Sequence, residues 1–386
     1  MERTDYETIC ALALNKIMGY VPRAARTLVA RFGSPGAVFS QDSRTLDLTF
    51  GPFNQHRPLI NERALEDAEA ELHALRERGC RFISMQHPAF PRLLQDCPDA
   101  PVGLYVRSES PLEQIRWDEN AVAVVGTRDI SPYGRRWTAE LVRGLGRCTP
   151  APAIVSGLAI GVDFVAHATA LDAGLPTIAV IPVGIFDVYP VRHTEIARRI
   201  ASTPGCALVT DFPPDTPAVP FNFLRRNRII AGLSRATVLA ESKSKGGGTL
   251  TARLASSYGR EVFAIPGRVD DVRSSGCNRL ISEGVAEALT DPGHFGERLG
   301  MRGGEAAMPL EKRLEACYAH ADPLTAGRVA AIARIVRART GITSEEICRE
   351  LGMEIGDVSA ALCLLESDGF IRTDLLGRCC IDDKKL

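Results

Sequence analysis

The sequence lacks both a membrane-spanning segment and a secretion signal. No apolar run reaches the roughly 18 residues that are needed to cross a bilayer. The first residues carry acids, at Glu2 and Asp5, where a signal peptide needs a basic end followed by an apolar stretch. We therefore expect no contact with a membrane and a location in the cytoplasm.

Regular cysteine spacing and an excess of positive charge are also missing. None of the eleven cysteines lie at a Cys-x-x-Cys spacing, and the nearest pair is the adjacent Cys379 and Cys380. Zinc sites and disulfide frameworks need better spacing, so we expect reduced, mostly buried thiols and no metal or other cofactor. Because 46 basic residues face 47 acidic ones, nucleic-acid binding would need a local basic patch.

What is present is the composition of a soluble folded protein with two or three domains. The chain has 386 residues, of which 45% are hydrophobic and 24% charged. Apolar spacing and turn signals predict four regions. These are a small helical domain at 1–78, an α/β domain at 79–293, a linker rich in Gly, Pro and Ala at 294–326, and a terminal domain at 327–386.

The α/β region alternates short apolar runs with helical stretches. We expect strands at 121–125, 153–155, 177–181, 207–210, 236–240 and 261–265, and helices at 134–145, 162–173, 194–200, 223–233 and 249–258. Continuous apolar strands separated by helices predict a mostly parallel sheet covered on both faces. Ligands of such sheets bind beyond the carboxyl ends of the strands, so the loops that follow the strands are the candidate sites.

The terminal region has the pattern of a winged helix. Thr343 is a predicted helix cap, and Glu346 completes a capping box with it. A second predicted helix runs from about Asp357 through Leu365. Two short apolar segments, around Ile371 and 379–381, then predict a hairpin.

Two of the strand-end loops have the form of anion sites. Gly126-Thr127-Arg128 follows the strand that ends at Val125, and a following helix would supply free N–H groups beside the arginine. Ser156 and Gly157 begin another glycine-containing turn into a helix, but the turn is neither Gly-x-Gly-x-x-Gly nor a Walker loop. No lysine follows it to hold a β- or γ-phosphate, so nucleotide hydrolysis by that route is not expected.

Ser156, Asp163 and His167 have the residue types of a catalytic triad. Asp163 and His167 share a helix face, but Ser156 lacks the Gly-x-Ser-x-Gly elbow that would expose its hydroxyl. We therefore favour a structural interpretation. In it, Ser156 and Asp163 shape the turn and cap the helix, and His167 makes one satisfying hydrogen bond.

The third loop leads into a predicted helix with three arginines within four residues, Arg225, Arg226 and Arg228. Helix N-termini favour acids, so the position is unusual and suits a polyanion. Two neighbouring phenylalanines, Phe221 and Phe223, could stack on unpaired bases. Internal salt bridges and core packing are the alternative, which we favour for Arg226 and for one phenylalanine.

The fourth loop, Glu241–Thr251, places lysines, serines and three glycines before a helix. This loop is another candidate anion-binding site, and the alternative interpretation is a flexible linker. Several phosphate-sized positions at one sheet edge, without a catalytic constellation, fit a strand of nucleic acid better than one small substrate.

Together these segments resemble the DprA/Smf family of DNA-processing proteins. The resemblance rests on GTRDISPYGRR (126–136), SGLAIGVDFVAHATAL (156–171), DFPPDTPAVPFNFLRRNRIIAGLS (211–234) and GGGTLTARLA (246–255). VYP at 188–190, REVFAIPG at 260–267 and NRLISEG at 278–284 match in order and spacing. It covers residues from about 80 to 290, and the flanking regions look like the SAM-like and winged-helix domains of the family.

The resemblance implies an extended Rossmann-like domain that binds single-stranded DNA, a homodimer, and no enzymatic activity. It also implies loading of RecA recombinase onto incoming DNA, which the protein would protect, during natural transformation. The candidate DNA-binding residues are Gly126, Thr127, Arg128, Ser156, Gly157, Phe221, Asn222, Phe223, Arg225, Arg226, Asn227, Arg228, Lys243, Lys245, Gly248 and Thr249. The family usually has a basic residue where Ile160 stands, and proline where Leu224 stands.

Two other functions are kept as alternatives. The first is a Rossmann-type enzyme or sensor that binds a nucleotide-derived small molecule, for which Glu241 is the candidate carboxylate. The second is a regulator that binds duplex DNA through the winged helix. Its predicted recognition helix, around 357–367, is acidic and lacks arginine, so we rank this function last.

Overall fold

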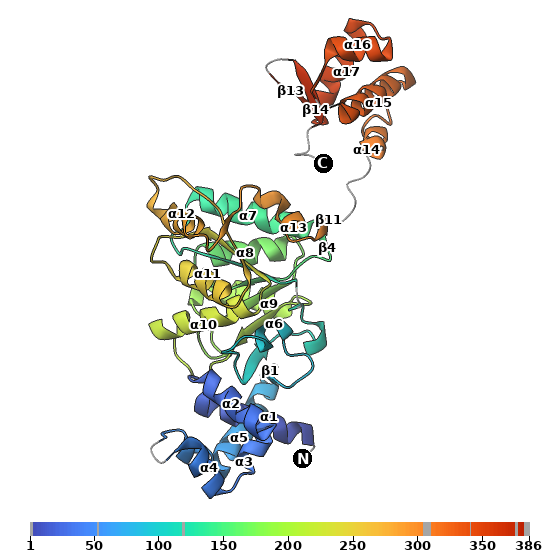
Figure 1. Ribbon diagram of the computed structural model, residues 1–386. Helices are drawn as coiled ribbons and strands as arrows, with labels where there is room; N and C mark the ends of the chain where they lie inside the picture. Colours follow the sequence, from blue (N-terminus) through green and yellow to red (C-terminus); the bar gives the residue numbers. More distant parts are fainter. Residues whose placement is uncertain are drawn as a thin grey trace. The chain divides into compact units, whose positions relative to one another are not determined.

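The chain divides into two compact units, Met1–Arg302 and Gly303–Leu386 (Figure 1). A computed structural model describes residues 3–51, 54–117, 120–303, 310–339, 341–374 and 377–381. All eleven cysteines are free and most are buried, as the sequence predicted. Among the described residues, no helix combines the length and the apolar character that a bilayer span requires.

The first unit begins with a group of helices, several of which start at proline or end at glycine. They are α1 (Arg3–Met18), α2 (Pro22–Phe32), α3 (Pro35–Phe39), α4 (Ser43–Phe50), the short 3-10 turn η1 (Arg57–Leu59) and α5 (Glu62–Glu77). The side chains of Ser34, Asp42 and Asn61 cap α3, α4 and α5 by accepting a backbone N–H bond. These helices agree with the predicted helical region.

In the described residues, nine strands form the central sheet of this unit. They are β1 (Cys80–Ser84), β2 (Gly103–Arg107), β3 (Val122–Gly126), β5 (Ile154–Ser156), β6 (Thr177–Val180), β7 (Ala207–Thr210), β8 (Ala236–Glu241), β9 (Glu261–Ala264) and β10 (Glu287–Ala288), in the order β1-β2-β7-β6-β5-β3-β8-β9-β10. From β7 to β10 the sheet is parallel, which confirms the predicted fold class. β1 and β2 add an antiparallel edge next to β7.

Helices cover both faces of the sheet (Figure 1). They are α6 (Arg92–Gln95), α7 (Pro132–Gly146), α8 (Val162–Asp172), α9 (Thr194–Ser202), α10 (Pro220–Gly232), α11 (Gly247–Ser257), α12 (Ser275–Ser282) and α13 (Phe295–Arg298). Successive side chains of a strand point to opposite faces. Val122 and Val124 of β3 therefore pack with α7 and α8, and Ala123 and Val125 pack with α10 and α11.

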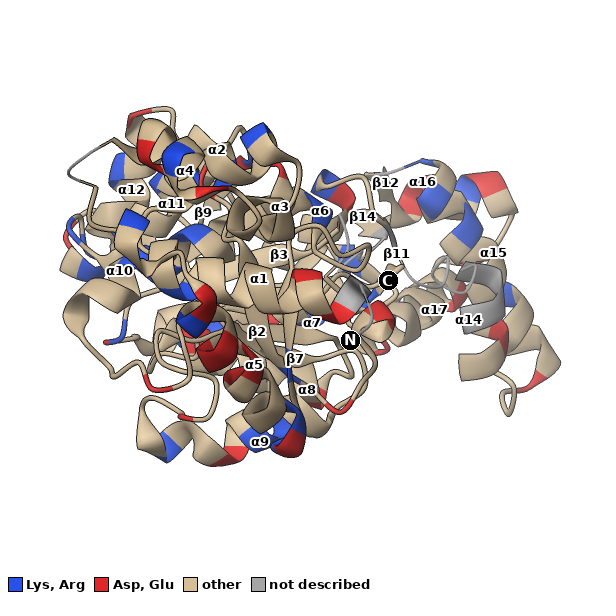
Figure 2. Ribbon diagram, turned by 90° about the horizontal axis from the view of Figure 1, so that it is seen from below, with Lys and Arg blue, Asp and Glu red and all other residues tan. Residues whose placement is uncertain are grey.

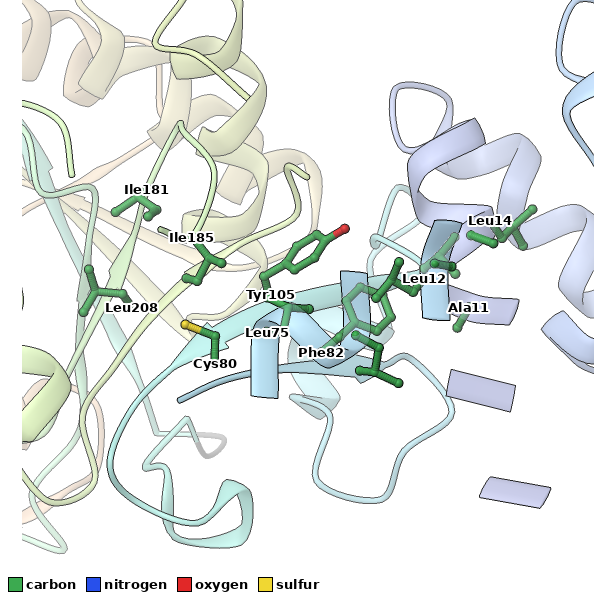
Figure 3. Packing of buried hydrophobic residues seen from close by; sticks show 14 of the residues in the cluster. Ala11, Leu12, Leu14, Leu75, Cys80, Phe82, Tyr105, Ile181, Ile185 and Leu208 are labelled. Atoms are coloured by element: carbon green, nitrogen blue, oxygen red, sulfur yellow. The ribbon is translucent and has the colours of Figure 1, made fainter. Parts of the chain in front are cut away.

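The helical region and the sheet share one continuous hydrophobic core. Figure 3 shows side chains of this core from both parts: Leu12, Leu14, Leu75, Cys80, Phe82, Tyr105, Ile181, Ile185 and Leu208. The ring of Tyr105 is fully buried, and its hydroxyl donates a hydrogen bond of 2.7 Å to Glu71 of α5. The predicted boundary between residues 78 and 79 therefore lies within a packed interior.

The predicted linker also begins inside the first unit. Phe295 and Leu299 are buried in the core that lies against α7, and Phe295 packs edge-on against Phe263 of β9 at 4.8 Å. Residues 304–309 of this predicted linker lie outside the described residues. One pair of short strands, β4 (Cys148–Thr149) beside β11 (Arg302–Gly303), lies outside the central sheet.

The second unit has the architecture of a winged helix. It contains α14 (Leu310–Cys317), α15 (Pro323–Ala338), β12 (Ile342–Thr343), α16 (Ser344–Leu351), α17 (Ile355–Ser367), β13 (Ile371–Thr373) and β14 (Arg378–Ile381). The strands form an antiparallel sheet in the order β12-β14-β13. Thr343 and Glu346 make the predicted capping box at the start of α16.

Candidate nucleic-acid interface

A cavity of about 860 Å³ opens where β3 and β8 end at the carboxyl edge of the sheet. The chain winds one way from β3 through β5, β6 and β7, and the other way from β8, so the cavity lies at the switch point where such folds bind ligands. Its lining includes nine of the candidate residues: Gly126, Thr127, Arg128, Phe223, Arg226, Asn227, Lys243, Lys245 and Gly248. Figure 2 shows basic and acidic residues interspersed over the ribbons. The cavity is lined by four cations, Arg128, Arg226, Lys243 and Lys245, and by two acids, Asp129 and Asp163.

Two glycines let the walls of the cavity approach closely. A Cβ atom on Gly248 would lie 3.0 Å from the Cα of Gly126, and one on Gly126 would lie 2.7 Å from the carbonyl oxygen of Glu241. The start of α11 therefore rests directly on the end of β3. This contact needs glycine at both positions.

The N-terminus of α11 lines the cavity, and the first N–H groups of a helix have no partner within the helix. Gly246 is its N-cap and has no side chain to cap the helix, and the first turn of this helix carries no acid. Lys243 and Lys245 precede it, and Lys243 also lies 3.9 Å from the exposed carboxylate of Asp129. Backbone N–H groups, the helix dipole and two lysines together favour an anion at this point.

Arg128 and Phe223 form the wall between this cavity and a smaller one of about 380 Å³. The Arg128 guanidinium lies over the Phe223 ring at 4.8 Å, and Tyr189 meets that ring edge-on at 5.3 Å. All three side chains line both cavities, and Ile160 and Gly157 line the smaller one. A cation on an aromatic ring places charge and a stacking surface side by side.

Arg226 is the buried cation of the larger cavity. Its side chain lines the cavity, although the residue is only 3% exposed. Burial lowers the pKa of Arg226 to about 10, against the opposing effect of Asp163, so the group stays charged at neutral pH. Within the described residues, its Nε and Nη1 atoms have no hydrogen-bond partner. Both atoms are also closed off from solvent, so the guanidinium contributes to the cavity mainly through its positive charge.

Asp163 holds the turn that faces Arg226. Its carboxylate accepts hydrogen bonds from the backbone N–H of Gly157 at 3.1 Å and of Ala159 at 3.3 Å. Burial raises the pKa of Asp163, and the charge of Arg226 opposes that rise. A Cβ atom on Gly157 would lie 1.5 Å from Nη1 of Arg226, so any larger residue at this position would displace the guanidinium.

Arg225 and Arg228 do not face the cavity, which contradicts the prediction that they neutralise phosphates. Both donate to the same Oδ2 atom of Asp211, Arg225 at 2.9 Å, and their side chains are only 8% and 7% exposed. Arg225 also donates to the carbonyl oxygen of Gly19, and Arg228 to that of Asp99. The two arginines therefore tie α10 to other elements, and the sequence did not reveal their shared counter-ion.

Four other candidate residues lie outside the larger cavity. Asn222 is buried and donates to the carbonyl oxygen of Pro217, and Thr249 donates to that of Gly246 within the start of α11. Ser156 is buried and donates to the carbonyl oxygen of Val124 at 2.7 Å. Phe221 is exposed on the outer side of α10. Sequence reasoning missed Tyr189 as a lining residue, although the VYP segment had been noted.

The structure confirms the structural interpretation of His167 and the turn-shaping role of Asp163, but the predicted helix cap was wrong, because the N-cap of the described helix α8 is Gly161 and it has no side-chain cap bond. Nδ1 of His167 lies 2.7 Å from the hydroxyl of Thr177, while Ser156 donates to Val124 and Asp163 accepts from the turn.

The candidate carboxylate of the small-molecule alternative, Glu241, already has hydrogen-bond partners within the protein. Glu241 is buried at the start of α7, where its two oxygens accept bonds from the N–H and hydroxyl of Ser131.

The buried His167 predicts a loss of stability in acid. Burial, followed by the charges of Arg226 and His193, lowers the pKa of His167 from 6.5 to about 3. Between these two values the unfolded chain binds a proton that the folded chain does not, so stability falls as pH falls, by at most about 1.4 kcal/mol per pH unit. We expect urea unfolding at about pH 6 and about pH 4 to show a smaller loss for His167→Gln than for the unmodified chain. Equal losses would contradict this.

Fold and cavity together define a Rossmann-like α/β protein with a cavity lined by basic residues at the carboxyl edge of its sheet. The family model for DNA recombination-mediator protein A matches residues 81–300, which is more than half of the chain. The chain belongs to this family, as the sequence resemblance predicted.

Known relatives support the assignment. The chain is 38% identical over 231 residues to protein Smf of Escherichia coli, a match that covers 60% of this chain and 60% of that protein. The structure of DprA from Streptococcus pneumoniae aligns with a TM-score of 0.63 and 30% identity, covering 76% of this chain and 96% of that one. DprA from Helicobacter pylori aligns with a TM-score of 0.50 and 28% identity, covering 56% and 95%. The Helicobacter pylori structure concerns the single-stranded DNA binding mode of that protein.

Proposed function

We propose that this chain binds single-stranded DNA in the cavity between β3 and β8 and acts as a recombination mediator. The observation that carries the proposal is the meeting of a buried cation, bare helix amides and an accessible aromatic ring in one cavity. Arg226 and the start of α11 would hold phosphate, together with Arg128 and the lysines. Phe223 would stack on a base, which excludes a paired strand.

The proposal includes RecA as a partner, a homodimer and a cytoplasmic location, with protection of incoming DNA during natural transformation. Family membership supports these parts, and the single-stranded DNA binding described for the Helicobacter pylori relative supports the ligand. Binding and handing over a strand need no bond to be made or broken. The cavity offers electrostatic and stacking contacts for that purpose.

The test is a titration with an oligothymidine strand at about 50 and about 200 mM salt. Each phosphate contact adds about 0.7 to the slope of log affinity against log salt for a single strand. We expect Lys243→Ala with Lys245→Ala to weaken binding and to reduce that slope by up to about 1.4. A duplex of equal length should bind less well, because its bases cannot reach Phe223.

Arg143→Ala with Arg235→Ala is the matched control, since it removes the same charge. Arg143 lies near the C-terminal end of α7 and Arg235 directly precedes β8, so both lie toward the opposite edge of the sheet. An unchanged slope in the lysine variant, or an equal loss in the control, would contradict the proposed site. Equal affinity for duplex would contradict stacking.

A further inference from the structure

A second aromatic surface lies on the outer side of α10. Phe221 is 61% exposed and Tyr20 is 53% exposed, and their rings are nearly parallel, at 22°, with centroids 6.3 Å apart. Val21, Val219 and Leu224 are also exposed beside them in the sequence. A cluster of large, solvent-exposed apolar side chains commonly marks a binding surface.

Polar contacts hold this pair of rings in place. The Tyr20 hydroxyl donates to Oδ1 of Asn222 at 3.4 Å, and Asn222 is anchored to the carbonyl oxygen of Pro217. The Arg225 guanidinium lies over the Tyr20 ring at 4.5 Å while its charge is compensated by Asp211. These contacts restrict the motion of the rings, which lowers the conformational entropy that is lost when a base stacks on them.

The surface is continuous with the cavity and electrostatically suited to the same ligand. Pro220 and Leu224, which flank Phe221 on α10, line the cavity. Two helices, α10 and α2, both begin with proline. Neither of these described helices has a side-chain cap or an acidic residue in its first turn. Two positive helix ends therefore converge near the rings, and the exposed Arg23 adds a charge in α2.

We propose that Tyr20 and Phe221 form a second base-stacking platform, which extends the path of the single strand from the cavity onto the helical N-terminal region. This inference rests on the proposed function. The occupant is single-stranded nucleic acid because flat rings stack on bases without sequence preference, and because the platform continues a site that already suits phosphate.

The test compares oligothymidines of about 6 and about 20 nucleotides, which bracket the site sizes of many single-strand binding folds. The short strand occupies the cavity alone, and the long strand reaches the platform. We expect Phe221→Ala and Tyr20→Ala each to weaken binding of the long strand by about 5-fold to 150-fold, with little change for the short strand. Leu48→Ala, at another exposed apolar residue of the helical region, is the control.

A Phe221→Trp variant gives an independent readout, because a stacked base quenches indole fluorescence. Quenching by the long strand but not by the short one supports the platform. If Phe221→Ala binds both strands like the unmodified chain, the platform is refuted while the cavity stands. If Phe221→Ala loses both strands alike, the platform is not a separate site. If the unmodified chain binds neither strand, the proposed function itself fails.

Discussion

Replacing Asp211 by asparagine should lower the free energy of unfolding of the first unit by about 3–5 kcal/mol. The Asp211 side chain is fully buried and compensates both Arg225 and Arg228 through one oxygen. Without it, two guanidinium groups stay in a poorly hydrated site with no negative partner. The desolvation cost of such charges is far larger than the loss of one hydrogen bond.

Asp215→Asn is the matched control for this change, since Asp215 lies in the same loop and is exposed. We expect its effect to stay within about 0.5 kcal/mol. Both variants can be compared by chemical denaturation at neutral pH. A similar small effect of both substitutions would show that the shared carboxylate does not stabilise the position of α10.

Replacing Phe223 by alanine should raise the dissociation constant for a single strand by about 5-fold to 150-fold, which corresponds to about 1–3 kcal/mol. The change removes the ring on which a base would stack and also the surface that supports the Arg128 guanidinium. Affinity for duplex DNA should change much less, because paired bases do not reach this ring.

Phe223→Tyr and Phe223→Leu separate stacking from apolar contact in the same assay. Tyrosine keeps an aromatic face and should retain most of the affinity, while leucine keeps bulk without that face and should behave like alanine. Full affinity in the leucine variant would rule out stacking at this position. Thermal unfolding of each variant checks that a loss of binding does not come from a loss of folded protein.

The parallel sheet was largely predictable from the sequence, because its strands are buried on both faces. The run Ala207–Thr210 was predicted with its observed bounds, and β8 with one residue fewer. The antiparallel edge formed by β1 and β2 was not assigned to particular residues. Cys80–Ser84 and Gly103–Arg107 contain arginine or glycine, so they lack the uninterrupted apolar signal of the predicted strands.

The site was predictable at the level of its loops and less so at the level of individual side chains. Residues three apart share a helix face, and Arg225 and Arg228 do so, but this spacing could not show that Asp211 from the end of β7 meets that face. Likewise, Tyr189 and Tyr20 reach the neighbourhood of α10 from distant segments. Contacts between elements depend on tertiary packing, which no local pattern encodes.

The burial of Tyr105 against Glu71 bears on how this chain can be shortened for experiments. A truncated protein that starts at residue 79 would leave Tyr105 and Phe82 facing water where α1 and α5 had covered them. Such a surface promotes aggregation of the recombinant fragment. Assigning a function to the amino-terminal helices will therefore require point substitutions on their outer side, since deletion would confound binding with solubility.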